Sequence, residues 1–227
     1  MNSLKDLFNK ETAKKRKATD KNQGRRSHAS LYETILEPYR NLAKKVFEVG
    51  IRNGGSIRVW RNYFPNAVIY ALDNHEPSLE CILNQERIIP VKLDQGSPKQ
   101  LDSFAKNGPF DIGIDDGSHI WKHQILTFEK LWPAIKPGGL YIIEDIITSY
   151  NSWMARHEGI KDRYCKNSIS CVNYFKYLID EINFHGADVD TIDEEEWSYY
   201  QLTVDWICFR NNSIFLRKRV VDFDKNA

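Results

Sequence analysis

The sequence contains no apolar run that approaches the roughly 18 residues of a membrane-spanning helix, and no N-terminal apolar segment typical of a secretory signal. Cysteine is scarce, and no cysteine stands in a CxxC pair; the four are Cys81, Cys165, Cys171 and Cys208. A zinc site or a disulfide framework is therefore not expected, and reduced thiols in a cytoplasmic protein are the simpler interpretation. The dinucleotide fingerprint GxGxxG is also missing, which disfavours a pyrophosphate site.

The net charge is only +1, but it is unevenly distributed. Residues 1–30 hold nine lysines and arginines against three acids, and Lys14–Lys17 is an unbroken basic run. Such a run can bind nucleic acid or another anionic surface. No aromatic platform, basic helix or NPPY-type base-flipping tetrapeptide accompanies it, so a nucleic-acid partner is disfavoured. We predict that residues 1–30 form a solvated, partly disordered basic arm and that residues 31–227 form one domain.

Apolar runs alternate with helical patterns from Lys45 onward, which predicts parallel strands joined by right-handed crossovers, with helices on both faces of the sheet. The five runs are Lys45–Gly50, Val68–Asp73, Ile88–Asp94, Phe110–Asp115 and Leu140–Asp145. The helical patterns are Leu31–Lys45, which Pro38 divides or kinks, and Ser56–Tyr63, Ser78–Asn84, Pro98–Lys106 and Lys122–Ile135. Lys136–Gly139 interrupts the pattern before the fifth strand.

The C-terminal third adds a loop, a helix and a hairpin. Residues 147–167 lose periodicity and are rich in aromatic residues, which is typical of a functional loop and predicts a lid. Ser170–Phe184 predicts a helix, and the acidic stretch Asp188–Glu196 a solvated linker. Gln201–Phe209 and Ser213–Arg219 indicate an antiparallel hairpin. The predicted fold is thus α/β, a single doubly wound Rossmann-like sheet of five parallel strands plus this hairpin.

The ends of the first three strands predict a cofactor site. The first strand leads into a turn with Gly50, Gly54 and Ser56, where the backbone can approach a ligand. Glu48 in this turn would repel a pyrophosphate but favour a cationic amino-acid group. Asp73 is placed to accept hydrogen bonds from ribose hydroxyls, and Asp94 and Gln95 to reach a base edge. Together they indicate S-adenosylmethionine, although a tight turn with a capping aspartate would give the same pattern.

The ends of the fourth and fifth strands predict a metal site. Asp115 and Asp116 follow one strand, and Glu144 and Asp145 end the next. Clustered carboxylates need a cation, and oxygen ligands favour Mg²⁺, with Mn²⁺ as a substitute. We predict Asp116, Glu144 and Asp145 as metal ligands, and Asp115, whose side chain should point the other way, as a brace of the strand end. The alternatives are a helix cap for Asp116 and a surface pair for Glu144 and Asp145.

His119 lies three residues after Asp116 and is the natural general base near neutral pH. A sugar or other alcohol hydroxyl is a poor nucleophile until a bound divalent ion lowers its pKa. His119 could then remove the proton while the oxygen attacks the sulfonium methyl group.

Two segments, Phe47–Asp73 and Ile114–Tyr150, resemble the metal-dependent class I sugar O-methyltransferases that use S-adenosylmethionine. The nearest types are the macrolide (mycinamicin) and rhamnosyl O-methyltransferases and the cephalosporin-hydroxylase-like group. The segment with Thr19, Asp20, Lys21 and His28 is similar to the family's TDK…H loop. The resemblance implies Asp116, Glu144 and Asp145 as Mg²⁺ ligands and His119 as the catalytic base. It also implies S-adenosylmethionine contacts for five residues: Glu48, Gly50, Asp73, Asp94 and Gln95. To these predicted cofactor contacts we add Gly54, Ser56 and Asp115.

The expected activity is Mg²⁺-dependent methyl transfer to a hydroxyl of a sugar, nucleotide sugar or glycan, and the predicted lid would choose this acceptor. Two alternatives stay open: a metal-dependent hydroxylase or hydrolase on the same scaffold, and a non-catalytic binding protein of a glycan pathway. A homo-oligomer is also possible.

Overall fold

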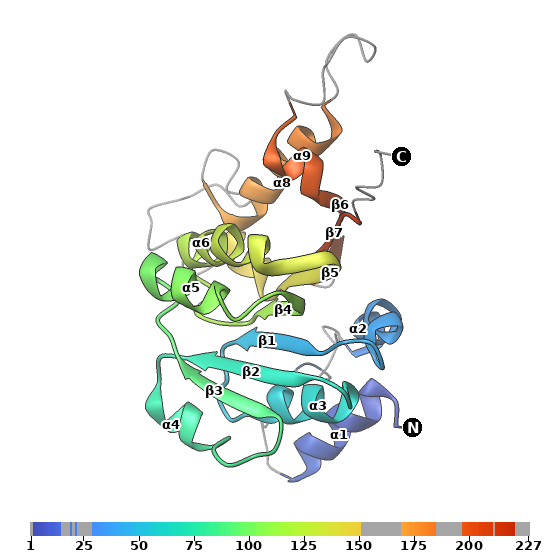
Figure 1. Ribbon diagram of the computed structural model, residues 1–227, viewed down its shortest axis with the longest axis vertical. Helices are drawn as coiled ribbons and strands as arrows, with labels where there is room; N and C mark the ends of the chain where they lie inside the picture. Colours follow the sequence, from blue (N-terminus) through green and yellow to red (C-terminus); the bar gives the residue numbers. More distant parts are fainter. Residues whose placement is uncertain are drawn as a thin grey trace, which may run out of the picture.

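The computed structural model describes residues 2–14, 19, 21, 29–150, 169–184, 197–210 and 212–220. One sheet of seven strands has the order β3-β2-β1-β4-β5-β7-β6 (Figure 1). Its strands are β1 (Lys45–Val49), β2 (Val68–Asp73), β3 (Ile88–Lys92), β4 (Phe110–Asp115), β5 (Ile135–Ile143), β6 (Val204–Arg210) and β7 (Ser213–Lys218). Strands β1 to β5 are parallel to one another, and β7 is antiparallel to both β5 and β6. The predicted fold is confirmed.

The helices cover both faces of the sheet (Figure 1). They are α1 (Leu4–Lys14), α2 (Ala29–Leu36), α3 (Gly55–Tyr63), α4 (Glu76–Glu80), α5 (Pro98–Ala105), α6 (Trp121–Leu131), α8 (Cys171–Asn183) and α9 (Tyr199–Thr203). Successive strand residues point to opposite faces, so Val46 packs with α1, α2 and α3, whereas Phe47 packs with α5 and α6. The carboxyl ends of the parallel strands meet at one edge of the sheet, where α/β folds bind their ligands.

The prediction of a solvated N-terminal arm is wrong for residues 4–14. These residues form α1, and Leu4, Leu7 and Phe8 are buried in the core. Phe8 packs edge-on against Trp60 of α3, with 5.5 Å between the ring centroids. Apolar residues at positions 4, 7 and 8 share one helical face, a pattern that the many surrounding charges conceal in the composition. Of the basic run, only Lys14 is among the described residues, and its ammonium pairs with Glu11.

Several element boundaries differ from those predicted. Strand β5 begins at Ile135, because residues 136–139 continue the strand past a register shift rather than interrupt it. Helix α6 ends at Leu131, since Pro133 leads into a short 3₁₀ turn, Trp132–Ala134. A second 3₁₀ turn, Glu37–Tyr39, follows α2 and divides the first helical pattern as expected at Pro38. The sequence pattern also missed α9, which replaces the first residues of the predicted hairpin strand.

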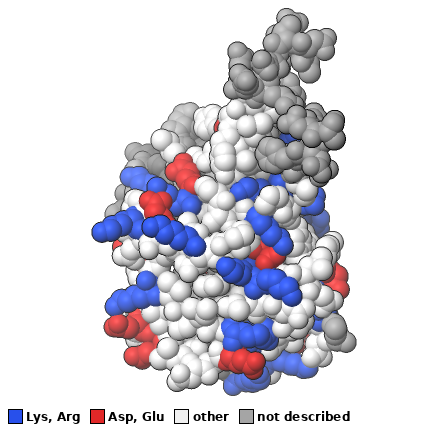
Figure 2. Space-filling view, in the orientation of Figure 1, with Lys and Arg blue, Asp and Glu red and all other residues white. Residues whose placement is uncertain are grey.

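Of the predicted lid, the described part is a 3₁₀ turn, Ile146–Ser149, with Tyr150 after it; residues 151–168 and the acidic linker lie outside the described residues. No helix in the described ranges is long and apolar enough to cross a membrane. On the face drawn in Figure 2, basic side chains are spread out, with acidic side chains beside several of them. Exposed ion pairs such as Lys92 with Glu76 and Arg217 with Asp205 are typical of a solvated surface.

Candidate active site

The carboxyl ends of the parallel strands open into a cavity of about 570 Å³. Eight of the predicted site residues line it: Gly50, Ser56, Asp73, Asp94, Gln95, Asp116, His119 and Asp145. The other four, Glu48, Gly54, Asp115 and Glu144, lie outside the lining. The structure therefore brings the predicted cofactor residues and the predicted metal residues to one cavity and sets some of them in a layer behind it.

The turn after β1 places the backbone of Gly50 against the loop after β4. Gly50 has a φ of +92°, and a Cβ there would lie 2.1 Å from the backbone oxygen of Asp116. Gly54, with a φ of +69°, precedes α3 and packs beside Ile82, so it shapes the turn without facing the cavity. The turn thus joins the cofactor side of the site to the metal side by direct backbone contact.

Asp73 and Asp94 line the cavity at the ends of β2 and β3, and backbone amides orient both carboxylates. Asp73 accepts hydrogen bonds from the amides of Ile51 at 2.9 Å and His75 at 2.9 Å. Asp94 accepts one from the amide of Gly96 at 2.9 Å. Neither carboxylate is held by an ion pair among the described residues. Both can accept further hydrogen bonds from a ligand that enters the cavity.

Gln95 and Asp115 brace the loop that carries Asp116 and His119. The Gln95 side-chain amide donates to both carboxylate oxygens of Asp115 at 2.8 Å, and its oxygen accepts from the amide of Ser118 at 2.9 Å. Asp115 is fully buried, and this burial raises its pKa to about 7. The expected bracing role of Asp115 agrees with this geometry, whereas its inclusion among the cofactor contacts does not. The Gln95 amide, expected near a base edge, is largely occupied by these bonds.

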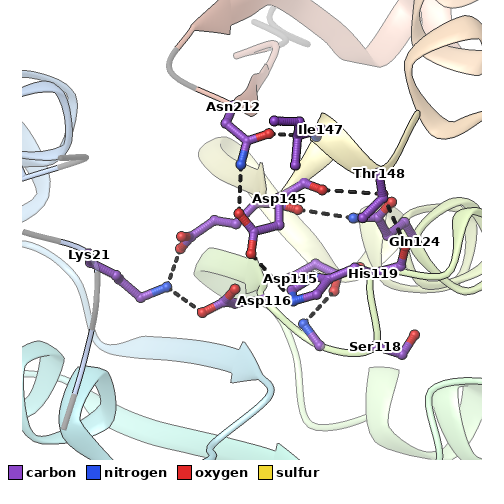
Figure 3. Close-up of polar contacts among 12 residues, drawn as sticks. Lys21, Asp115, Asp116, Ser118, His119, Gln124, Asp145, Ile147, Thr148 and Asn212 are labelled. Carbon is purple, nitrogen blue, oxygen red and sulfur yellow. Dashed lines mark hydrogen bonds and ion pairs between the residues drawn. The ribbon is translucent and has the colours of Figure 1, made fainter. Parts of the chain in front are cut away.

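Lys21 connects three of the acids. Its ammonium lies 2.7 Å from Asp116 Oδ2 (Figure 3). It also lies 3.2 Å from Glu48 Oε1 and contacts Glu144 Oε1. The Lys21 side chain is only 2% exposed. Carboxylate oxygens of the three acids lie within 4.8 Å of one another, which we call the inner acid group: Glu48, Asp116 and Glu144.

Neutral donors complete the inner acid group. The Ser56 hydroxyl donates to Glu48 Oε2 at 2.7 Å, and the indole of Trp60 donates to the same oxygen at 3.1 Å. The Tyr32 hydroxyl donates to Glu144 Oε1 at 2.6 Å. Burial raises the pKa of Glu48 to about 7 although Lys21 opposes the shift. Burial alone would lower the pKa of Lys21, but the surrounding acids outweigh it and raise that pKa well above its ordinary value, so Lys21 stays charged.

A second set of candidate metal ligands faces the cavity. Asp116, His119 and Asp145 offer ligand atoms within 4.8 Å of one another, and we call them the outer group. Asp145 has a φ of +56°, and Asn212 of the hairpin turn donates to its Oδ1 at 2.6 Å (Figure 3). His119 Nε2 lies 3.5 Å from Asp145 Oδ2. The three predicted metal ligands are thus divided, since Glu144 belongs to the inner acid group, Asp145 to the outer group and Asp116 to both.

These donor sets suit a hard divalent cation. Oxygen atoms dominate both groups, one imidazole joins them, and no cysteine belongs to either. That composition fits Mg²⁺ or Mn²⁺ better than zinc. The cavity also offers two carboxylates and a glycine turn at the ends of β1–β3, which suit an adenosine bearing an amino acid.

The site-residue prediction did not include several residues that the structure brings to the site. Thr19, Arg52, Ser118 and His123 line the cavity, and Tyr32 and Asn212 hold the acids. The imidazole of His123 contacts the Ser118 hydroxyl at 3.0 Å. Tyr32 and Asn212 come from distant segments that no local pattern links to the site. Asp20 and His28 lie outside the described residues.

Comparison with known proteins finds sugar O-methyltransferases among the proteins whose sequences are similar to this chain. Over 204 residues, the chain is 33% identical to the 8-demethyl-8-alpha-L-rhamnosyl tetracenomycin-C 2'-O-methyltransferase of Streptomyces olivaceus, covering 86% of this chain and 51% of that enzyme. Over 167 residues, it is 41% identical to the Mycinamicin VI 2''-O-methyltransferase of Micromonospora griseorubida, covering 70% of this chain and 40% of that enzyme. The chain spans about half the length, or less, of these relatives. No protein-family model matches.

A solved structure agrees with these relatives. The MycE methyltransferase of mycinamycin biosynthesis, in complex with Mg and SAH, superimposes with a TM-score of 0.81 at 30% identity. The match covers 98% of this chain and 56% of that chain. The same enzyme with Mg, SAH and mycinamycin VI gives a TM-score of 0.78.

Proposed function

Since the chain belongs to the family of glycoside sugar O-methyltransferases, we propose that it transfers a methyl group from S-adenosylmethionine to a hydroxyl of a sugar or glycoside in a Mg²⁺-dependent reaction. The observation that carries this proposal is the shared cavity. Asp73 and Asp94 lie on its cofactor side and Asp116, His119 and Asp145 on its metal side. A methyl donor and an acceptor hydroxyl would therefore meet within one enclosed space.

S-adenosylmethionine would occupy the ends of β1–β3. Asp73, held by the amides of Ile51 and His75, would accept hydrogen bonds from the ribose hydroxyls. Asp94 would face the base. Gly50 allows the chain to pass close to the methionine part. Glu48, Gly54 and Asp115 would support this side from behind the wall rather than touch the cofactor.

Mg²⁺ would be held by Asp116 and Asp145 of the outer group, with Glu144 of the inner acid group as the third acid. In that position a divalent cation supplies Lewis acidity, which lowers the pKa of an acceptor hydroxyl. Asn212 fixes Asp145, and Tyr32 fixes Glu144, so these carboxylates are oriented by hydrogen bonds.

His119 would accept the proton of the acceptor hydroxyl. Its Nε2 is the ring nitrogen that faces Asp145, and its side chain is 29% exposed on the cavity wall. The Thr148 hydroxyl donates to the backbone oxygen of His119 at 3.2 Å, which helps to hold this residue at a φ of +57°. A neutral imidazole at this point has a ring nitrogen that can accept a proton from a hydroxyl.

The acceptor class rests on the relatives, which methylate rhamnosyl or mycinamicin sugars by their names. The test is transfer of an isotopically labelled methyl group from S-adenosylmethionine to a panel of rhamnosyl glycosides, macrolide glycosides and nucleotide sugars, with Mg²⁺ or with EDTA. Labelled glycoside that forms only with Mg²⁺ supports the proposal. Hydroxylated or hydrolysed glycoside without label would instead favour a hydroxylase or hydrolase, and binding without any turnover a glycan-binding protein.

A further inference from the structure

Lys21 is the one basic side chain that the described residues place on the inner acid group. It comes from the segment between α1 and α2, whereas Glu48 lies in β1, Asp116 follows β4 and Glu144 follows β5. The side chain of Glu48 is fully buried, that of Glu144 is 4% exposed and that of Asp116 is 24% exposed. The ammonium of Lys21 therefore contacts acids from β1, from the loop after β4 and from the loop after β5.

Neutral hydrogen bonds cannot balance the charge of these acids. Ser56, Trp60 and Tyr32 donate to Glu48 and Glu144, which orients the carboxyl groups but adds no positive charge beside them. Buried like charges within 4.8 Å repel each other, and each has lost hydration. The positive charge that offsets this repulsion comes from Lys21.

Lys21 also lies close enough to the proposed metal ligands for its charge to change their affinity for a metal ion. It contacts one oxygen of Asp116 and one of Glu144, both proposed Mg²⁺ ligands, from the side opposite Asp145 and His119 (Figure 3). Lys21 itself lines the cavity, so a cation that reaches Asp116 would meet the outer group on one side of this carboxylate and the ammonium on the other. Two positive charges on one carboxylate repel each other, so the ammonium weakens metal binding while it holds the acids in place.

We propose that Lys21 is a built-in counter-ion of the metal site. It keeps Glu48, Asp116 and Glu144 assembled before a divalent cation binds, and its charge lowers the affinity for that cation. The proposal rests on the proposed function in one respect, because it takes Asp116 and Glu144 as metal ligands.

The test compares Lys21→Met with Lys92→Met, which removes an exposed lysine paired with Glu76 on the surface. Thermal unfolding is recorded for both variants and the unaltered chain, in EDTA and in Mg²⁺. Lys21→Met should unfold at a lower temperature in EDTA, because the inner acids then lack a cation. Mg²⁺ should raise its unfolding temperature more than that of the unaltered chain, since a ligand stabilises the fold in proportion to its affinity. Lys92→Met should behave like the unaltered chain.

Calorimetric titration with Mg²⁺ gives the second readout. Lys21→Met should bind Mg²⁺ about tenfold more tightly or better, because a repelling charge is gone. Lys21→Arg keeps the charge and should retain the weaker affinity. If Lys21→Met does not fold in EDTA, the double variant Lys21→Met/Glu48→Gln removes one acid with the amine and should fold and bind Mg²⁺ more tightly than the unaltered chain.

Equal or weaker Mg²⁺ binding by Lys21→Met, or by the double variant in its place, would overturn the proposal. S-adenosylmethionine binding by the unaltered chain is measured in the same preparations. An unaltered chain that binds neither Mg²⁺ nor S-adenosylmethionine counts against the proposed function. One that binds both, with no tighter Mg²⁺ binding after Lys21→Met, counts against the role of Lys21 alone.

Discussion

Gly50→Ala tests whether the contact between the two halves of the site is structurally required. Alanine at a φ of +92° is strained by about 1–2 kcal/mol. Its Cβ would also lie 2.1 Å from the backbone oxygen of Asp116. Either the turn after β1 or the loop after β4 must therefore move. Overpacking of this kind costs a further 1–3 kcal/mol or so. The expected loss in free energy of unfolding is therefore about 2–5 kcal/mol.

Gly138→Ala is the matched control. Gly138 has a φ of +75°, but a Cβ there would meet only a side-chain carbon of Val220, at 3.2 Å. Its cost should be about 1–2 kcal/mol, from strain alone. The gain from a less flexible unfolded chain is the same for both variants and cancels in the comparison. The difference between them thus isolates the overlap with Asp116.

Urea unfolding of both variants measures the two costs, and calorimetry measures Mg²⁺ and S-adenosylmethionine binding. Gly50→Ala should lose more stability than Gly138→Ala and should bind both ligands more weakly, because the displaced loop carries Asp116. Equal stability losses together with unchanged binding in both variants would refute the reasoning.

The remaining predictions concern the acids and the base. His119→Ala should keep its affinity for S-adenosylmethionine but lose turnover by a factor of about 10²–10⁴ in the methyl-transfer assay, and unchanged turnover would exclude His119 as the base. Asp116→Asn should weaken Mg²⁺ binding in a calorimetric titration, and an unaltered affinity would remove this residue from the ligand set. The raised pKa of Asp115 should reduce the free energy of unfolding as the pH rises from 3.8, the ordinary pKa of aspartate, to about 7. Over this range the folded protein keeps a proton on Asp115 that the unfolded chain has released. Urea unfolding in EDTA should show Asp115→Asn gaining stability relative to the unaltered chain across this range and no further above it; a constant difference at all pH values would contradict the raised pKa.

The parallel sheet was predictable because each strand is a local pattern. A strand that is buried on both faces must be apolar along its length, and five such runs alternate with helical spacing. The same rule places polar residues at the strand ends, which is why Asp73, Asp94 and Asp116 were found from the sequence. The fold and the place of the site follow from short-range signals of this kind.

The N-terminal segment was not predictable in the same way. Its composition is that of a solvated arm, yet three apolar residues on one face of α1 bury it against α3. Lys21 stands in a segment that resembles a family loop, but its role depends on contacts with residues that lie up to 123 positions away in the chain. Composition averages over a segment, whereas burial depends on a few side chains and on the surface that they meet.

The division of the acids was also beyond sequence reasoning. For the neighbours Asp115 and Asp116, strand geometry predicted side chains that point different ways, and the structure has Asp115 buried and Asp116 on the cavity wall. The positions of Glu48 and Glu144 in the inner acid group depend on Tyr32, Ser56 and Lys21. No spacing rule links these residues, because the sheet brings them together only after folding.

Calorimetric titration of the chain with S-adenosylmethionine, in Mg²⁺ and in EDTA, tests the central claim most directly. We predict binding at one site, lost or strongly weakened in Asp73→Asn, whose carboxylate would hold the ribose. No binding of S-adenosylmethionine with or without Mg²⁺ would contradict the methyltransferase account.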